Sequence, residues 1–313
     1  MSGYTALRAS AAWLDVSGRG ALRATGEDRQ RFLHAMCTQP VEDLQPGQGA
    51  YAFFLDPQGR IQSDAHLLAR GDHVFVETEP EAVGPLVQHL ERFIIMDDVT
   101  LEDLTSSVSV VALEGPAADE IAGSLFGELP TRAFAGVEAE SLLIVRNSLT
   151  GQPGWRFVAE SGRGADLVHR IERAGAAPAS AEDFRTVRVE NQVARFGEDF
   201  FLSNLPQETQ RLDAVSFTKG CYIGQEIVER VRSRGQVNRL LVGLELESGT
   251  APAAGSAVMF EDEEVGRLTS PVYSPALGRA AGFSILRRHA ATAGASVSVE
   301  GVRGKVRTER KPA

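Results

Sequence analysis

Two apolar stretches joined by a short turn constrain the fold of this chain more than any other feature. The stretches cover residues 51–55 and 61–69, and the sequence DPQGR lies between them. A five-residue connection containing proline and glycine, between two segments of strand character, is typical of a β-hairpin. A hairpin pairs its strands in antiparallel fashion. The sequence therefore predicts an antiparallel sheet rather than one assembled from parallel β-α-β units.

Helix-type and strand-type segments alternate along the chain as far as residue 235. Besides the hairpin, strands are expected over residues 13–23, 73–78, 107–113, 141–146 and 155–159. Helices are expected from residue 27, over residues 80–93, after Gly115-Pro116, over residues 164–174, and from Phe184 onward, with Glu190 near the start of the last helix. This mixture of helices and hairpins favours an α+β fold with antiparallel sheets.

The character of the sequence changes after Gly235. Residues 240–246 and 297–306 alternate between apolar and polar side chains, and short segments broken by Gly, Pro and Ser lie between them. Several short strands at this spacing are typical of a small β-barrel. A chain of 313 residues is also larger than one core usually supports. We therefore expect an α+β region over residues 1–235, with two subdomains, and a C-terminal barrel over residues 236–313.

Composition narrows the classes of protein to which the chain can belong. The net charge of −10 argues against general nucleic-acid binding. The sequence contains no long apolar run and its N-terminus does not resemble a signal peptide, so we expect a cytoplasmic protein, by default a monomer. The two cysteines, Cys37 and Cys221, are too few for a disulfide framework or a four-thiolate cluster. The six histidines are scattered, and no metal site is predicted.

One of the cysteines lies in an unusual segment, KGCYIGQEIVER, at residues 219–230. Gly224 precedes what reads as the start of a helix, and Cys221 lies just before it and close to Lys219. A thiolate is stabilised at such a position, both by the helix N-terminus and by the lysine. A lone cysteine is also commonly a small buried apolar residue. The residue types alone leave both interpretations open.

Positive charge gathers in the same part of the chain. Residues 219–239 hold five basic side chains against two acidic ones, with a net charge of +3: Lys219, Arg230, Arg232, Arg234 and Arg239 against Glu226 and Glu229. Within the predicted helix, Glu226 and Arg230 lie four residues apart and can pair on one face. The cluster fits an anion site, for example for the glutamate tail of a folate, and it fits a solvated helix face or an arginine–carboxylate network equally well.

The pattern K-G-C-Y-x-G-Q-E-x-x-x-R resembles the signature of the YgfZ-type folate-binding proteins. These form a branch of the glycine-cleavage T-protein (aminomethyltransferase) superfamily, which also includes mitochondrial iron–sulfur assembly proteins. The resemblance extends over nearly the whole chain, through the segments DRQRFL (28–33), GRI (59–61) with Asp64, TGQPGW (150–155), RVE (188–190), PQE (206–208) and GRLTS (266–270). It implies a T-protein-like ring of antiparallel α+β domains plus a C-terminal β-barrel, around a central hole that binds tetrahydrofolate or a derivative.

The resemblance also implies a catalytic carboxylate. Asp64 matches the aspartate that faces the folate in T-proteins and assists transfer of the methylene group. A carboxylate can take this role by hydrogen bonding to a folate nitrogen or by steering a proton, if the pocket tunes its pKa. On residue type alone, Asp64 is equally an aspartate on the surface of a strand.

Glutamates and aromatic residues are the candidates for holding the pterin ring. Glu190 or Glu208 can accept two hydrogen bonds from the adjacent donors of a pterin, and the sequence does not decide between them. Either is also plausible as an acid on a helix surface. Tyr51, Phe53 or Trp155 is a candidate to flank the ring, although an aromatic residue on a strand more often belongs to the core.

The cysteine motif supplies the remaining site residues and the expected function. The resemblance places Lys219, Gln225, Glu226 and Arg230 at the folate site, and Cys221 at its rim, where the thiol meets a cluster, a persulfide or a partner thiol. T-proteins lack this motif. The expected function is a tetrahydrofolate-binding accessory protein in iron–sulfur cluster assembly or repair, whose partners are iron–sulfur enzymes or assembly proteins. The alternatives are a folate-dependent aminomethyl or one-carbon transferase or demethylase, and a folate-independent interaction module.

Overall fold

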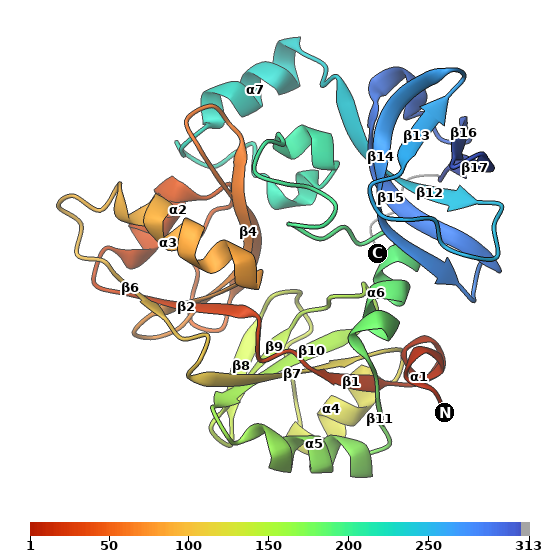
Figure 1. Ribbon diagram of the computed structural model, residues 1–313. Coiled ribbons are helices and arrows are strands. Elements are labelled where there is room, and N and C mark those ends of the chain that lie inside the picture. Colours follow the sequence, from red (N-terminus) through yellow and green to blue (C-terminus); the bar gives the residue numbers. More distant parts are fainter. Residues whose placement is uncertain (308–313) are drawn as a thin grey trace.

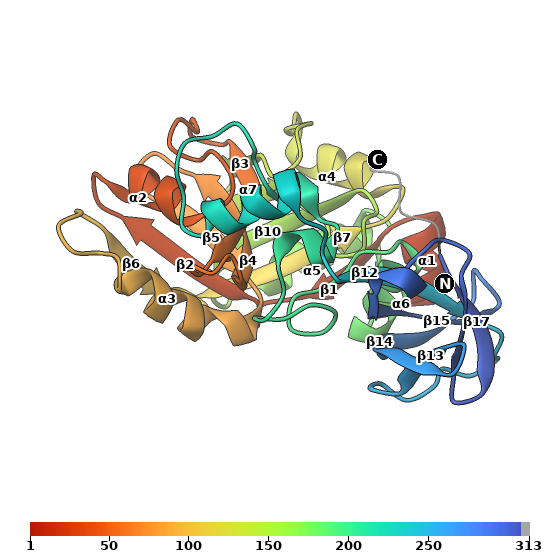
Figure 2. The same cartoon turned by 90° about the horizontal axis from the view of Figure 1, so that it is seen from above.

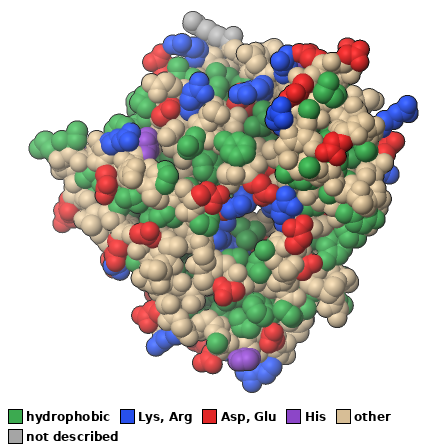
Figure 3. Space-filling model, viewed as in Figure 1, with side chains coloured by type: hydrophobic (Ala, Val, Ile, Leu, Met, Phe, Trp, Pro, Cys, Tyr) green, Lys and Arg blue, Asp and Glu red, His purple; other side chains and the backbone are tan. Residues whose placement is uncertain are grey.

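The computed structural model describes residues 1–307, which form three lobes (Figures 1 and 2). The face shown in Figure 3 is hollowed at its centre, and this hollow is called the central hole below. The lobes are a five-stranded sheet, a six-stranded sheet and a closed six-stranded barrel. All strand pairs are antiparallel except the two-residue pairing of Ala12–Asp15 with Ala177–Pro178. The expected α+β fold with antiparallel sheets and a C-terminal barrel is confirmed.

The first lobe carries the predicted hairpin. In spatial order its strands are β3 (Gly49–Leu55), β4 (Ile61–Ala69), β5 (Val74–Thr78), β2 (Gly20–Thr25) and β6 (Thr100–Asp103). Its helices are α2 (Arg29–Met36) and α3 (Val83–Glu91), the latter preceded by the 3-10 turn η1 (Pro80–Ala82). Both helices cover one face of the sheet, where Leu33 and Leu86 pack against Phe54 and Leu67.

The register of the hairpin decides which side chains face the hole. Tyr51 lies opposite His66, and Phe53 lies opposite Asp64. Because side chains alternate along a strand, these four residues share the face that is not covered by α2 and α3. The period of two in the sequence thus places Asp64 and His66 side by side.

The second lobe lies below the first in Figure 1. In spatial order its strands are β11 (Ala177–Pro178), β1 (Ala12–Asp15), β7 (Val108–Glu114), β10 (Gly154–Glu160), β9 (Leu142–Arg146) and β8 (Gly136–Ala139). Its helices are α1 (Gly3–Ala9), α4 (Ala118–Phe126), α5 (Gly164–Arg173) and α6 (Ala181–Glu190). The helices α4 and α5 cover the outer face, and α6 leads toward the barrel.

The prediction for α6 was wrong in its position. We expected a helix starting near Phe184 with Glu190 close to its start, but the helix begins at Ala181 and ends at Glu190. The cause is a capping box, in which the Ser180 hydroxyl accepts from the Asp183 amide while the Asp183 carboxylate accepts from the Ser180 amide. Such a box fixes the first turn of a helix. Glu190 consequently lies in the last turn.

The third lobe is the barrel. Its strands are β12 (Arg239–Leu246), β13 (Ala257–Phe260), β14 (Glu263–Ser274), β15 (Arg279–Arg287), β16 (Ser296–Val299) and β17 (Val302–Val306). The connection from α6 to the barrel contains the 3-10 turns η2 (Pro206–Thr209) and η3 (Leu212–Ala214) and the helix α7 (Gln225–Arg234). A further 3-10 turn, η4 (Arg288–Ala290), follows β15 within the barrel. We propose a domain boundary between residues 235 and 236. None of the helices within residues 1–307 is both long and apolar enough to span a lipid bilayer.

Candidate functional site

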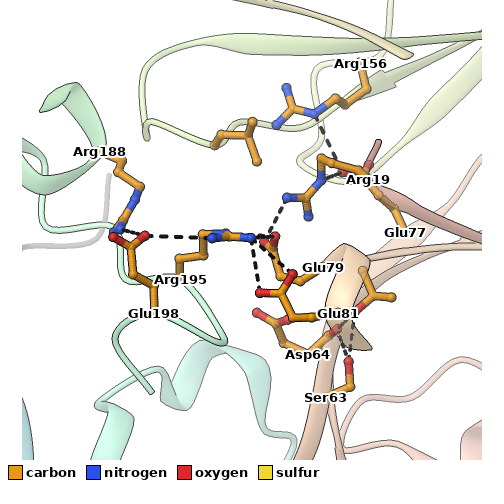
Figure 4. A network of polar contacts seen from close by, with 12 residues as sticks. Arg19, Ser63, Asp64, Glu77, Glu79, Glu81, Arg156, Arg188, Arg195 and Glu198 are labelled. Atoms are coloured by element: carbon orange, nitrogen blue, oxygen red, sulfur yellow. Dashed lines mark hydrogen bonds and ion pairs between the residues drawn. The ribbon is translucent and has the colours of Figure 1, made fainter. Parts of the chain in front are cut away.

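Charged side chains surround the hollow at the centre of the face shown in Figure 3. Eight charged side chains form one chain of ion pairs, which Figure 4 shows in close view. The members, from the barrel side inward, are Arg188, Glu198, Arg195, Glu81, Glu79, Arg19, Glu77 and Arg156. They come from residues far apart in the sequence, so the chain of ion pairs exists only in the assembled fold.

The ion pairs join the first two lobes. Arg19, next to β2, donates to Glu77 at 2.5 Å and to Glu79 at 2.8 Å, and Arg195 donates to Glu79 at 2.9 Å. Glu77 also lies 3.7 Å from the guanidinium of Arg156 on β10 in the second lobe.

The chain of ion pairs reaches the barrel through the last turns of α6. Arg188 donates to Asp199 at 2.7 Å and to the hydroxyl of Ser270 on β14 at 2.7 Å. Asp199 is completely buried and also accepts from Thr269 at 2.8 Å. Buried charges are tolerated when they are paired and hydrogen-bonded, as these are.

Asp64 lies beside this network, on the face of β4 directed toward the hole (Figure 4). Its Oδ2 accepts a hydrogen bond of 2.8 Å from the Tyr51 hydroxyl. Burial raises the pKa of Asp64 to about 6, and the neighbouring Glu79 carboxylate adds to this rise. Burial also holds the pKa of Tyr51 well above its usual range, so Tyr51 remains a hydrogen-bond donor. A carboxyl group with a pKa near 6 can both hold and release a proton near neutral pH.

Rings and a guanidinium surround Tyr51. The His66 ring lies 4.8 Å from it and the Phe134 ring 6.2 Å from it, between ring centres, and the guanidinium carbon of Arg211 lies 4.6 Å from its centre. Burial lowers the pKa of His66 to about 3, so His66 is neutral, and its Nδ1 is buried without a hydrogen-bond partner in the described structure. Phe134 has a φ of 63°, a strained value for a residue with a side chain.

Glu190 lies at the junction of α6 with α1 and β14. Its Oε1 accepts from the Tyr4 hydroxyl at 2.7 Å and from Ser274 at 2.6 Å. Its Oε2 is buried and makes no hydrogen bond to the described residues, although the Arg8 guanidinium lies 3.7 Å away. A buried carboxylate oxygen without a hydrogen bond destabilises the folded protein, so a bound ligand that donates to this oxygen would gain binding free energy. No hydrogen bond or ion pair within residues 1–307 joins Glu190 to Asp64.

Glu208 has a different set of contacts. Within η2, its Oε2 accepts from the Asn204 side chain at 2.7 Å and from the Leu205 amide at 3.3 Å. Its Oε1 lies 3.4 Å from Arg239 at the start of β12. Both oxygens are therefore engaged in fastening η2 and the barrel.

The two other aromatic candidates are completely buried. Trp155 packs in the core of the second lobe, where its ring nitrogen donates to Asp119 at 2.9 Å. Phe53 packs edge-on against Phe200, 6.0 Å away between ring centres. Of the three aromatic candidates, Tyr51 is the one that hydrogen-bonds to Asp64.

The cysteine motif lies between the C-terminal end of α2 and the start of α7. Cys221 is exposed, whereas Cys37 is buried and burial raises its pKa. The description as a small buried apolar residue thus fits Cys37 and not Cys221. Lys219 donates from Nζ to the carbonyls of His34, Cys37 and Gln39, at 2.5, 2.7 and 3.1 Å. All three of its protons are used in this way.

The basic residues of this region are mostly paired with acids. Arg230 donates to Glu226 at 2.7 Å on the exposed face of α7, and Arg232 lies 3.4 Å from Glu229. Arg239 pairs with Glu208, as described above. The side chain of Arg234 lies outside the described part of the structure. Gln225, partly buried, is the first residue of α7. The geometry favours an arginine–carboxylate network over an anion site.

Residues 2–219 match the GCVT N-terminal domain, and residues 239–312 match the glycine cleavage T-protein C-terminal barrel domain. The chain belongs to the glycine cleavage T-protein family. It is 30% identical to an aminomethyltransferase of Rubrobacter xylanophilus over 90% of this chain and 77% of that protein. It is 29% identical to an aminomethyltransferase of Geobacillus kaustophilus over 96% of this chain and 86% of that protein.

A solved structure gives the same fold. The glycine cleavage system aminomethyltransferase T of Bartonella henselae superimposes with a TM-score of 0.87, over 98% of this chain and 87% of that one, at 18% sequence identity. The two domain matches confirm the expected superfamily. The assignment to the YgfZ-type branch remains a prediction that rests on the cysteine motif.

Within this family fold, the sequence-based candidates separate into two groups. Asp64 and Tyr51 meet beside the hole, whereas Lys219, Cys221 and the start of α7 gather at the end of α2. No hydrogen bond or ion pair joins the groups in the part of the chain that the structure describes.

Sequence reasoning missed several residues that surround Asp64, namely Arg19, His66, Glu79 and Arg211. The sequence could have indicated His66, because this residue follows Asp64 by two positions on a strand and therefore lies on the same face of the sheet. The others come from distant segments and leave no local pattern.

Proposed function

We propose that the chain binds tetrahydrofolate in the central hole and takes part in a folate-dependent one-carbon transfer, in which Asp64 donates or accepts a proton. The observation that carries this proposal is the position of Asp64, beside the hole, bonded to Tyr51, with its pKa raised to about 6. The similarity to two aminomethyltransferases supports the same class of reaction. The chain would accordingly be an enzyme of the transferase class.

One buried glutamate offers an acceptor that suits a pterin. A pterin presents adjacent N–H donors, and the buried Oε2 of Glu190 is an acceptor without a donor. Glu208 offers no comparable atom, since both of its oxygens are engaged. We therefore assign the pterin to Glu190. Tyr51 is the aromatic residue next to Asp64, and its hydroxyl keeps one carboxylate oxygen fixed.

Tetrahydrofolate supplies the nitrogen atoms that carry a one-carbon unit. The chain itself positions a carboxyl group that is partly protonated near neutral pH, and that can give a proton to a leaving amine or take one from an attacking amine. The hydrogen bond from Tyr51 to Oδ2 orients this group. We leave Lys219 out of the folate site because its Nζ is fully engaged with three carbonyls.

Calorimetric titration of anaerobic tetrahydrofolate into the protein tests the proposal. The wild type should bind saturably, and Asp64→Ala should weaken binding by tenfold or more. Asp72→Ala serves as the matched control, because Asp72 lies in the same lobe with a side chain that is 89% exposed. Absence of binding by the wild type would refute the folate site and favour an interaction module without folate.

A second candidate function is folate-dependent maintenance of iron–sulfur enzymes, with such enzymes or their assembly proteins as partners. The exposure of Cys221 within the KGCYIGQE segment is the observation that favours it. A strain lacking this protein, complemented with wild type, Cys221→Ala or Cys37→Ala, distinguishes the two functions. Full recovery of iron–sulfur enzyme activity by Cys221→Ala would rule out a role for the thiol, and loss with that variant alone would establish one.

A further inference from the structure

We propose that Arg211 is a positioning residue for Asp64 and that it acts through the ring of Tyr51. The inference rests on the proposed folate site, because it assigns a task to a neighbour of that site. Neither the sequence motifs nor the similarity to aminomethyltransferases singles out this arginine.

Two contacts link these three residues in a row. The guanidinium carbon of Arg211 lies 4.6 Å from the centre of the Tyr51 ring, and the Tyr51 hydroxyl lies 2.8 Å from Oδ2 of Asp64. A flat guanidinium against an aromatic ring is attractive, and more so when the pair is shielded from water. The contact therefore restrains the ring and the direction of its hydroxyl.

Arg211 is itself held by a two-bond ion pair. Its Nε and Nη2 donate to the two carboxylate oxygens of Asp213, each at 3.0 Å. A two-bond fork of this kind fixes the orientation of the guanidinium plane as well as its position. Arg211 thus presents a prearranged surface to the tyrosine ring.

The segment that carries Arg211 is anchored to two lobes. Gln210, which adopts a φ of 59°, donates from its side chain to the carbonyl of Leu241 in β12 of the barrel at 2.5 Å. On the other side, Thr38 and Gln39 of the first lobe donate to the carbonyls of Ala214 and Asp213, at 2.6 and 2.8 Å. The barrel and the first lobe together fix the position of Arg211.

Loss of this contact should turn the ring without unfolding the site. The rings of His66 and Phe134 also lie near Tyr51, so packing around the ring persists without the guanidinium. The remaining effect is on the hydrogen bond to Asp64. Because the positive charge of Arg211 also acts on Asp64 directly, the test needs a variant that keeps the charge and removes the flat surface. Arg211→Lys does this.

The experiment follows the titration of Asp64 by carbon-13 NMR of the labelled carboxyl group in wild type, Arg211→Lys, Tyr51→Phe and the double variant. A hydrogen bond to a carboxylate lowers its pKa, so each single variant should raise the midpoint, by about one unit. If Arg211 acts through the ring, the double variant should shift no further than Tyr51→Phe alone. Additive shifts, or an unchanged midpoint in Arg211→Lys, would overturn the proposal.

The two proposals fail in different ways. Absence of tetrahydrofolate binding by the wild type would refute the folate site, whereas the carboxyl titration would still decide the role of Arg211. If the wild type binds tetrahydrofolate, the pH midpoint of binding should shift in Arg211→Lys in parallel with the carboxyl titration, and an unshifted midpoint would count against the proposal.

Thermal unfolding monitors the fold of each variant. Should Arg211→Lys fail to fold, Asp213→Asn removes the fork and should shift Asp64 in the same direction, and no shift in that variant would refute the role.

Discussion

Lys219 and Cys37 lie 182 positions apart in the sequence, and the Lys219 ammonium group donates to the Cys37 carbonyl at 2.7 Å. Two further carbonyls, of His34 and Gln39, accept from the same ammonium group. The last carbonyls of a helix have no partner within the helix, and a lysine is well suited to satisfy them. The lysine of the cysteine motif thus fastens the motif to the end of α2.

Replacing this lysine should lower stability. Lys219→Ala leaves three carbonyls without their charged donor, and we expect the free energy of unfolding to fall by about 3 kcal/mol. Urea denaturation measures this change. Lys305→Ala, at an exposed position in β17, is the control and should change stability little. Equal stability of both variants would contradict the structural role.

The pKa of Asp64 makes stability depend on pH in a specific direction. Its folded pKa of about 6 lies above the usual 3.8, so the folded protein holds the proton more tightly than the unfolded chain does. The resulting stabilisation of the fold is fully present below pH 3.8 and is lost as the pH rises through about 6. Near pH 7, Asp64→Asn should therefore be more stable than the wild type by about 2 kcal/mol. Urea denaturation across this range gives the comparison. Parallel pH profiles of the two proteins would show that the carboxyl group is not perturbed.

His66 should make the free energy of unfolding change with pH in the opposite direction. Its folded pKa of about 3 lies below the usual 6.5, so the unfolded chain takes up a proton that the folded chain excludes. The free energy of unfolding should fall as the pH drops from 6.5 toward 3, by about 3 kcal/mol at pH 4.5. His66→Gln should remove this slope, whatever its stability at neutral pH. Retention of the slope in the variant would assign it to other groups.

The two thiols should differ sharply in reactivity. Cys221 is exposed and Cys37 is completely buried, so a thiol reagent should modify one equivalent in the folded protein and a second after unfolding. Mass spectrometry of the labelled peptides identifies the site. Rapid labelling of Cys37 in the native protein would contradict this arrangement.

Gly224 fixes the start of α7 against the tip of the hairpin. Its φ is 83°, and a Cβ placed there would lie 2.6 Å from the carbonyl oxygen of Asp56 and 3.0 Å from Cα of Gly59. Gly224→Ala should therefore cost about 2 kcal/mol or more, because both the backbone angle and the contact are unfavourable. Denaturation against Gly249→Ala, where nothing lies within 4 Å of a Cβ, provides the test.

The sequence predicts those features that depend on neighbouring residues. The hairpin at residues 49–69 follows from its turn and its apolar stretches, and the barrel from its short alternating strands. Short segments without a strong pattern were missed. One example is β8 (Gly136–Ala139), which follows the left-handed Phe134, and another is β6 (Thr100–Asp103), whose residues are mostly exposed.

The surroundings of the candidate site depend on contacts between distant residues. Arg19 meets Glu77 and Glu79 across 58 and 60 positions, and Arg195 meets Glu79 across 116. No spacing rule relates such residues, so their pairing becomes visible only once the lobes are placed. Asp64 was found because it forms part of a family pattern, while the arginines that surround it belong to none.

The ion pairs around the hole also bear on how the protein is made. Their members extend from Arg19 to Glu198, and Arg188 is joined to Ser270 in the barrel. A ribosome releases these residues in order, so the first two lobes emerge well before the strand that completes the ring. Until β14 leaves the exit tunnel, Arg188 and Asp199 lack the Ser270 hydroxyl that bonds to both of them in the finished protein. The hydrogen bonds that tie this network to the barrel thus form only at the final stage of synthesis.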